Sequence, residues 1–255
     1  MKLSALLAGS LLCVFSVSAQ ESPEVSRGPD GGTRVHVGGI EILLTAGNPF
    51  SGRDSIDWTR HLEDGTLQTV HLDAKLARDN QGRVYRERRS FVPANAGVPA
   101  GQESKLKDII ILDPVARTRT SCNVAARHCD VTRYRGPSAF RPPADGSFDA
   151  GARYLTRESL GTDVIDGLSV VGTRETVTVN AGVVGNSQPL VSTKEFWYSA
   201  DLGINLAVTR KDPREGTQVI HVVDLSRTEP DPTMFQVPAG YAVQDRRLAA
   251  RESEN

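Results

Sequence analysis

Short strand-like runs separated by tight-turn signals recur along most of this chain. Residues 55–62 alternate apolar and polar side chains, which is the period of a half-buried β-strand. An Asp-Gly dipeptide at 64–65 follows, and this pair is a strong short signal for a β-hairpin turn. Residues 67–78 then run back, and a turn at 79–82 leads into the next run. This order predicts an antiparallel meander, in which each strand pairs with the next one along the chain.

The second half of the chain repeats this pattern. Further strand-like runs, again separated by turn signals, cover 158–179, 190–199, 204–212 and 218–228. Aromatic residues make up only 5% of the chain, and its 23 glycines and 14 prolines suit tight turns better than a helical bundle. The chain is therefore predicted to be mainly β, with a single strongly curved antiparallel sheet, a half-barrel, and few short helices.

Three further segments bear on how this sheet is built and covered. A first strand pair is predicted at 34–37 and 41–45, split by two glycines. The apolar run 107–112 is expected to form a central strand. Near the other end, a proline-bracketed turn is expected to bring Phe235 and Val237 back against the core.

The two ends of the chain are predicted to lie outside the folded domain. Residues 1–19 combine a lysine, a mostly apolar run and a final Val-Ser-Ala, which is typical of a cleavable signal peptide; a signal anchor is the alternative. No apolar segment after residue 20 is long enough to cross a bilayer. The expected location is therefore the periplasm or the exterior of the cell. The remaining boundaries are a flexible leader at 20–33, a β half-barrel domain at 34–243 with a long loop at 136–151, and a disordered tail at 244–255.

Two of the three cysteines, Cys122 and Cys129, remain after the predicted cleavage, and an even number suits an oxidising compartment. Both lie in strand-like runs that flank a turn, so they can face each other across a strand pair. The sequence therefore predicts a disulfide between them. A metal site that includes His128 is the alternative, although a single histidine at this spacing makes a poor zinc pattern.

Charge and motifs argue against several classes of function. The 30 basic and 31 acidic residues give a net charge of −1, so no global field draws the chain to nucleic acid or anionic lipid. The sequence contains no GxSxG nucleophile motif and no phosphate-binding glycine loop. Carboxylate pairs occur at Glu63/Asp64 and Glu229/Asp231, but both lie in turn signals. We therefore predict a non-enzymatic protein with no catalytic residue, no metal and no cofactor.

One histidine pair is a candidate for an enzymatic site. His61 and His71 lie on neighbouring strands of the first predicted hairpin, where Asp57 or Asp73 could complete a two-histidine site. The alternative is that both histidines occupy exposed strand positions opposite polar neighbours.

Basic residues concentrate between positions 78 and 107. The alternation along 83–89 places Arg83 and Arg89 on one face of a strand, and Arg86 and Arg88 on the other. Such a strand could dock an acidic partner or lipid head groups. The alternative is a solvated outer face, which also discourages pairing at a sheet edge.

Six short runs carry a resemblance to known proteins. In chain order they are LEDGT at 62–66, ARDNQGR at 77–83, ILDPVA at 111–116, GTR at 172–174, EFWYS at 195–199 and EPDPTMFQVP at 229–238. Together they resemble a group of uncharacterised exported bacterial proteins over residues 45–243. The meander and the closing Phe-x-x-Pro-x-x-Tyr are also similar to LolA-like proteins, the periplasmic half-barrels that sort and bind lipoproteins.

The resemblance implies an antiparallel half-barrel whose concave, mostly apolar face holds acyl chains or a segment of a partner. This chain departs from the lipoprotein carriers in two ways. No segment matches the helices that cover their half-barrel, and the cysteine pair is particular to this chain. No catalytic residue carries over.

We therefore predict an exported binding protein that holds an apolar or lipid ligand, or a lipoprotein segment, in the concave face of the sheet. Plain core packing is the alternative for every residue predicted to line that face. An envelope structural or sensing module, which contacts another protein through a sheet edge or the basic strand, is a second function; a hydrolase with a dispersed site is a third. The predicted lining residues are Trp58, Leu62, Ile109, Ile111, Phe196, Tyr198, Leu206 and Val208.

Overall fold

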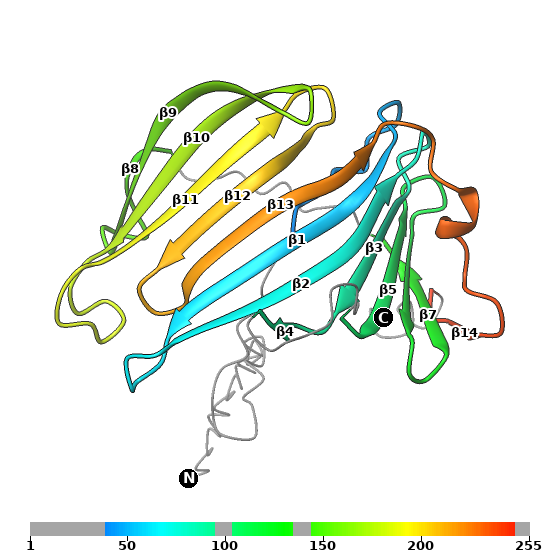
Figure 1. The fold of residues 1–255 in the computed structure, drawn as a ribbon, viewed down its shortest axis with the longest axis horizontal. Coiled ribbons are helices and arrows are strands. Elements are labelled where there is room, and N and C mark those ends of the chain that lie inside the picture. The colour runs from blue at the N-terminus through cyan, green and yellow to red at the C-terminus, as the bar shows by residue number, and fades with distance from the viewer. Residues whose placement is uncertain (1–38, 95–103, 135–143, 248–255) are drawn as a thin grey trace, which may run out of the picture. The chain divides into compact units, whose positions relative to one another are not determined.

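A computed structural model describes residues 39–94, 104–134 and 144–247 of the chain (Figure 1). Within these residues, fourteen strands share one sheet. The first seven are β1 (Phe50–His61), β2 (Leu67–Arg78), β3 (Val84–Arg89), β4 (Val92–Pro93), β5 (Leu106–Asp113), β6 (Thr118–Asn123) and β7 (His128–Arg133). The others are β8 (Gly146–Phe148), β9 (Arg153–Ile165), β10 (Leu168–Val179), β11 (Leu190–Ser199), β12 (Ile204–Asp212), β13 (Gly216–Ser226) and β14 (Ala242–Asp245). The described ranges also contain one short 3-10 helix, η1 (Pro232–Phe235).

The sheet consists of two meanders joined at its centre. The strand order is β14-β7-β6-β5-β3-β2-β1-β13-β12-β11-β10-β9-β8, and β4 pairs with β2 beside this path. Strand β1 lies between β2 and β13, so an early and a late part of the chain are neighbours (blue and orange in Figure 1). All strand pairs are antiparallel except β14 with β7. The edge strands β14 and β8 do not pair with each other, so the sheet is not closed.

The predicted turns form where the sequence places them. In the β1–β2 turn, Gly65 has a φ of 80°, and the Asp64 carboxylate accepts a 2.9 Å hydrogen bond from the Thr66 N–H. In the β9–β10 turn, Asp166 and Gly167 have φ values of 48° and 74°, the left-handed conformation that a two-residue hairpin turn requires. Local turn chemistry therefore sets the register of both hairpins.

Bulges bend the sheet at several strand pairs. The register shifts in β1–β13, β9–β10 and β11–β12, and in the last of these Leu206 is the extra residue between paired Asn205 and Ala207. A bulge increases the local twist and bends the strand that carries it. The prediction of a mainly β fold with one strongly curved antiparallel sheet, a half-barrel, is confirmed.

The C-terminal segment covers a small core on one face of the first meander. Phe235 is buried there with the Cys122–Cys129 disulfide, which bridges a directly paired position of β6 and β7. The Asp231 carboxylate caps η1 by accepting a hydrogen bond from the Thr233 N–H, and this fixes the turn that leads to Phe235. Val237 packs against the same core. The predictions of the disulfide and of the returning C-terminal segment are therefore confirmed.

Several predicted boundaries differ from the structure or lie beyond it. The predicted signal peptide, the leader and the strand at 34–37 lie outside the described residues. Residues 41–45 form no strand, so the predicted first strand pair is wrong in this half. Residues 146–148, within the predicted long loop, form edge strand β8, and β14 extends to residue 245, inside the predicted tail.

Across the described residues, no helix has the length and apolar character needed to cross a bilayer.

Candidate functional site

One face of the sheet carries a continuous apolar row across its central strands. Ile56 in β1 pairs with Leu72 in β2 and with Ile220 in β13. The row continues from Ile220 to Val208 in β12 and from Val208 to Phe196 in β11. Residues that pair directly across antiparallel strands point to the same face, so these side chains form one surface. All of them are buried except Phe196, which is half-buried.

A segment of extended chain belongs to this surface. Residues 39–46, here called the strap, precede β1, and within them the burial alternates: Ile40 and Ile42 are buried, whereas Glu41 and Leu43 are exposed. Such alternation is typical of a strand-like backbone that presents one side to a core. The strap nevertheless joins no strand ladder. Its attachment therefore depends on side-chain burial and on a small number of polar contacts.

The sheet wraps around the strap, which makes the apolar face concave. Burial lowers the pKa of Lys194 in β11 and raises the pKa of Tyr134 after β7, and the Glu41 carboxylate acts electrostatically on both groups. A hydrogen bond shows the same curvature: the Arg78 guanidinium in β2 donates at 2.5 Å to the Leu202 carbonyl in the β11–β12 turn, although β2 and β12 are three positions apart, roughly 14 Å in a flat sheet.

Asp54 anchors the start of the strap. Its Oδ2 accepts a 3.1 Å hydrogen bond from the Ile40 N–H and lies 3.6 Å from a guanidinium nitrogen of Arg86. Burial raises the pKa of Asp54 to about 7, although Arg86 and the Ile40 N–H act in the opposite direction. Its Oδ1 is also buried and has no hydrogen-bond partner among the described residues. Of the two carboxylate oxygens of Asp54, therefore, Oδ2 binds the strap, and Oδ1 is a buried acceptor without a hydrogen-bond partner among the described residues.

Arg78 anchors the other end of the strap. This buried guanidinium donates hydrogen bonds of 3.1 Å to the Leu43 carbonyl and to the Thr45 hydroxyl. It also donates to the Asn48 carbonyl, at 2.8 Å, and to the Leu202 carbonyl, at 2.5 Å. Buried charges require such partners, because an unpaired guanidinium would be costly to remove from water. Arg78 thus ties β2 to the strap and to the β11–β12 turn.

Five of the eight residues predicted to line the concave face lie on it. Trp58 follows Ile56 by two positions in β1, and its indole N–H donates a 2.6 Å hydrogen bond to the Glu215 carbonyl. In β12, Leu206 is fully buried and Val208 is buried. Phe196 is half-buried and Tyr198 is 39% exposed, so the β11 end of this face is the less covered part.

The other three predicted residues lie elsewhere. Ile109 pairs with Cys122, and Ile111 belongs to the same core beneath Phe235, on the opposite face from the strap. Alternation along β5 instead gives Ile110 to the concave face, where it pairs with Arg86. Leu62 follows the end of β1 and is 40% exposed. Adjacent apolar positions left the facing of β5 undetermined in the sequence, because a one-residue change of register reverses it.

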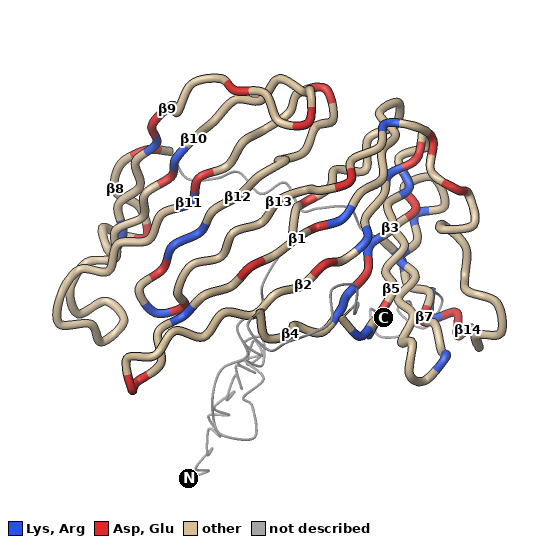
Figure 2. The backbone as a smooth tube through the Cα atoms, viewed as in Figure 1, with Lys and Arg blue, Asp and Glu red and all other residues tan. Residues whose placement is uncertain are grey.

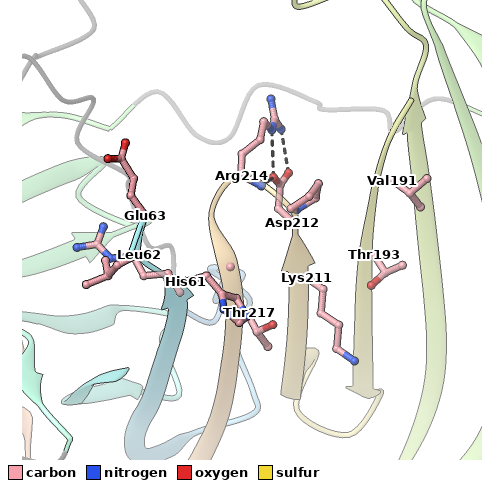
Figure 3. A pocket seen from close by; sticks show the side chains of 12 residues that line it. His61, Leu62, Glu63, Val191, Thr193, Lys211, Asp212, Arg214 and Thr217 are labelled. Atoms are coloured by element: carbon pink, nitrogen blue, oxygen red, sulfur yellow. Dashed lines mark hydrogen bonds and ion pairs between the residues drawn. The ribbon is translucent and has the colours of Figure 1, made fainter. Parts of the chain in front are cut away.

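A surface pocket of about 660 Å³ lies at the end of β1 beside the β12–β13 turn (Figure 3). Thr193, Lys211 and Thr217, which pair in one row across β11, β12 and β13, belong to its lining. Asp212 and Arg214 form an ion pair at 2.8 Å in the same lining, and hydrogen bonds from Arg214 lower the pKa of Asp212. Lining side chains of this kind suit water and ions better than a lipid chain.

The two predicted site histidines do not come together. His71 lies between Asp57, at 2.7 Å, and Asp73, at 3.4 Å, and burial lowers its pKa, but the bonds to both carboxylates outweigh burial and raise it. His61 pairs with Leu67, four positions further along the hairpin, and lines the pocket instead. Within the described ranges, no group of three or more His, Cys, Asp or Glu residues is arranged to hold a metal ion.

The basic strand is neutralised by neighbouring carboxylates. Figure 2 shows acidic positions interspersed with the basic ones around β3. Arg86 lies beside Asp54, and Arg88 lies 3.4 Å from Asp108. Arg83 pairs with Asp79 and Arg89 pairs with Glu87, each through a short ion pair. This arrangement gives no uncompensated positive surface along β3 for an acidic partner.

No protein-family model matches the sequence, and no curated protein matches it. An uncharacterised conserved protein from Thermus thermophilus matches with a TM-score of 0.39 and 10% identity, over 78% of this chain and 91% of the other. The Pseudomonas aeruginosa MucA/MucB complex matches with a TM-score of 0.37 and 13% identity, over 77% and 58%.

A putative outer membrane lipoprotein-sorting protein domain from Vibrio parahaemolyticus also matches, with a TM-score of 0.19 and 10% identity, over 74% of this chain and 89% of that one.

Proposed function

We propose that this chain is an exported binding protein, without enzymatic activity, whose concave face holds an apolar ligand, either a lipid chain or a lipoprotein segment. The observation that supports this proposal is the strap. An extended apolar face of the sheet is covered there by a segment that belongs to no strand ladder. A face that packs Ile40 and Ile42 without β-pairing offers the apolar surface that a ligand in the same place would need.

The proposed binding protein is exported and consists of a single folded domain. Export through a signal peptide at 1–19, a leader at 20–33 and one domain at 34–243 remain predictions from the sequence. Sequencing the N-terminus of the mature protein checks the first of these, and we expect it to begin at Gln20. A mature chain that still carries residue 1 would contradict export by cleavage.

A fluorescent fatty acid tests the binding proposal. cis-Parinaric acid is expected to bind the full chain, and the double substitution Phe196→Ala/Tyr198→Ala is expected to weaken its binding by about tenfold or more, because both side chains lie at the less covered end of the concave face. Fluorescence titration gives the dissociation constants.

The matched control for this titration is Val191→Ala. Val191 is exposed on the same strand, β11. Alternation along the strand places Phe196 and Tyr198 on the concave face and Val191 on the opposite, convex face. This variant should bind as the wild type does. No binding by the wild type, or an equal loss in both variants, would contradict a fatty-acid site on the concave face.

A further inference from the structure

The two anchors of the strap recognise main-chain groups. Asp54 accepts a hydrogen bond from the main-chain N–H of Ile40, and Arg78 donates to the main-chain carbonyl of Leu43. Both anchor side chains are buried. A buried acceptor and a buried donor need these partners, since leaving them unpaired is costly. An acyl chain has neither an amide N–H nor a row of carbonyls to offer them.

The side chains of the strap define what fits between the anchors. Ile40 is 1% exposed and Ile42 is 6% exposed, while Leu43 is 43% exposed. The face thus receives branched aliphatic side chains two residues apart, the spacing of one side of an extended polypeptide. This combination of apolar positions and main-chain contacts is specific to a peptide.

Gly39 fixes how closely the strap approaches its anchor. A Cβ atom at this position would lie 2.9 Å from a nitrogen of Arg86 and would overlap the Oδ2 of Asp54. Any larger residue must therefore push the strap or the ion pair aside. A substitution here disturbs the strap without removing any apolar side chain from the core.

We propose that the strap is a built-in occupant of the concave face, and that the ligand that displaces it is an extended polypeptide segment with branched aliphatic residues two positions apart. The proposal rests on the proposed function, because it assumes that the concave face receives an occupant from outside. Since the strap pairs with no strand, it can leave without separating any part of the sheet ladder. An occupant on the same chain also competes at a high effective concentration, which lowers the apparent affinity for any outside peptide.

The test uses the full chain and a fluorescein-labelled peptide with the sequence of residues 39–46. The double variant Ile40→Ser/Ile42→Ser should bind this peptide at least about tenfold more tightly than the wild type, because its own strap no longer competes. Leu43→Ser, a change of an exposed side chain in the same segment, should bind as the wild type does. The same peptide with serine at both isoleucine positions should not bind to any of them.

Two further measurements keep the test decisive if the double variant folds poorly. Gly39→Ala should also bind the labelled peptide more tightly, because the added Cβ disturbs the contact between the strap and the Asp54–Arg86 pair. In the wild type, a high concentration of the peptide should increase hydrogen exchange at residues 39–46. Unchanged exchange in the wild type, together with unchanged affinity in Gly39→Ala, overturns the inference.

Titration with cis-parinaric acid separates this inference from the proposed function. If that acid binds wild type and strap variants equally while the peptide binds none of them, the concave face holds ligands but the strap does not compete, and the inference fails alone. If the acid binds the strap variants more tightly and the peptide binds none, the ligand is an acyl chain and the peptide class is wrong. If the peptide binds and the acid does not, the inference stands and the lipid form of the proposed function fails.

Discussion

Asp54 is a carboxylate on the apolar concave face, paired with Val222 and Ala74, and its burial links the stability of the protein to pH. Its pKa is about 7 in the folded chain, against an ordinary value of 3.8, with burial as the main cause. The folded state therefore binds this proton more tightly than the unfolded state does. The resulting stabilisation is complete below pH 3.8, decreases as the pH rises from 3.8 to about 7, and is lost above that range.

We predict that Asp54→Asn removes this pH dependence. An asparagine has the same size, and its side-chain oxygen can still accept from the Ile40 N–H, but it does not titrate. The unfolding free energy of the variant should therefore rise relative to wild type between pH 4 and pH 7.5, by on the order of 4 kcal/mol. Urea unfolding at several pH values measures the difference.

Asp163→Asn serves as the control for this experiment. Asp163 is an exposed carboxylate in β9, five strand positions from β1, which carries Asp54. Its substitution should leave the pH dependence of wild type in place. If Asp54→Asn and wild type give parallel curves of stability against pH, Asp54 is ionised and well solvated in the folded protein, contrary to the prediction.

At the scale of residues, the sequence allows part of the concave face to be predicted. Trp58, Phe196 and Val208 could be predicted from the sequence, because apolar side chains at alternate strand positions indicate one face. Asp54 and Arg78 could not be predicted to lie on that face, because charged residues in a strand are ordinarily solvated. One signal was available: Asp54 shares the alternation of Ile56 and Trp58, so the pattern that predicts an apolar face also places a carboxylate on it.

At the scale of elements, the β6–β7 hairpin is held by its disulfide at the pair Cys122–Cys129. Both cysteines are fully buried in the core beneath Phe235. The two cysteines therefore contribute in two ways. Their covalent bond closes a short loop. Their buried side chains form part of the core surface against which the C-terminal segment packs.

We predict that reduction of the disulfide lowers the unfolding free energy by about 2–3 kcal/mol, as expected for closure of so short a loop. Because the bond is buried, the protein should be reduced while unfolded and then refolded in reductant. Urea unfolding with and without reductant gives the change. The variant Cys122→Ala/Cys129→Ala should be less stable in both conditions and insensitive to the reductant; an equal response of variant and wild type would mean that the bond contributes nothing.

The turns, whose conformation depends on residues adjacent in the sequence, could be predicted from the sequence, whereas the conformation of the strap could not. The Asp64-Gly65 and Asp166-Gly167 turns depend on local backbone conformation, which the residues themselves specify. The strap has the alternation of a strand, and the sequence therefore predicts one. Whether the strap pairs as a strand depends on whether an adjacent strand offers free hydrogen-bonding groups. The strap is held instead by the side chains of Asp54 and Arg78, which lie 14 and 35 residues away from their partners Ile40 and Leu43 in the sequence.

At the scale of the whole sheet, the sequence predicts the meanders and the curvature but not how the meanders join. Hairpin-linked strands pair with their sequence neighbours, and this local rule gives most of the observed order. The pairing of β1 with β13 follows no such rule, since it joins Asp54 to Val222. The same holds for the parallel pairing of β14 with β7, which requires the chain to cross the core first.

The β1–β13 pairing has a consequence for the order in which the protein folds. It closes a loop that contains most of the chain, and the entropy of such a closure must be overcome before its contacts form. We expect the hairpins of each meander, such as β6–β7, to form first and the seam between β1 and β13 to form last. In pulsed hydrogen exchange during refolding, the amides of β6–β7 should therefore become protected before those of β1 and β13. Simultaneous protection of both would mean that the sheet forms in one step, with the central seam already present in the transition state.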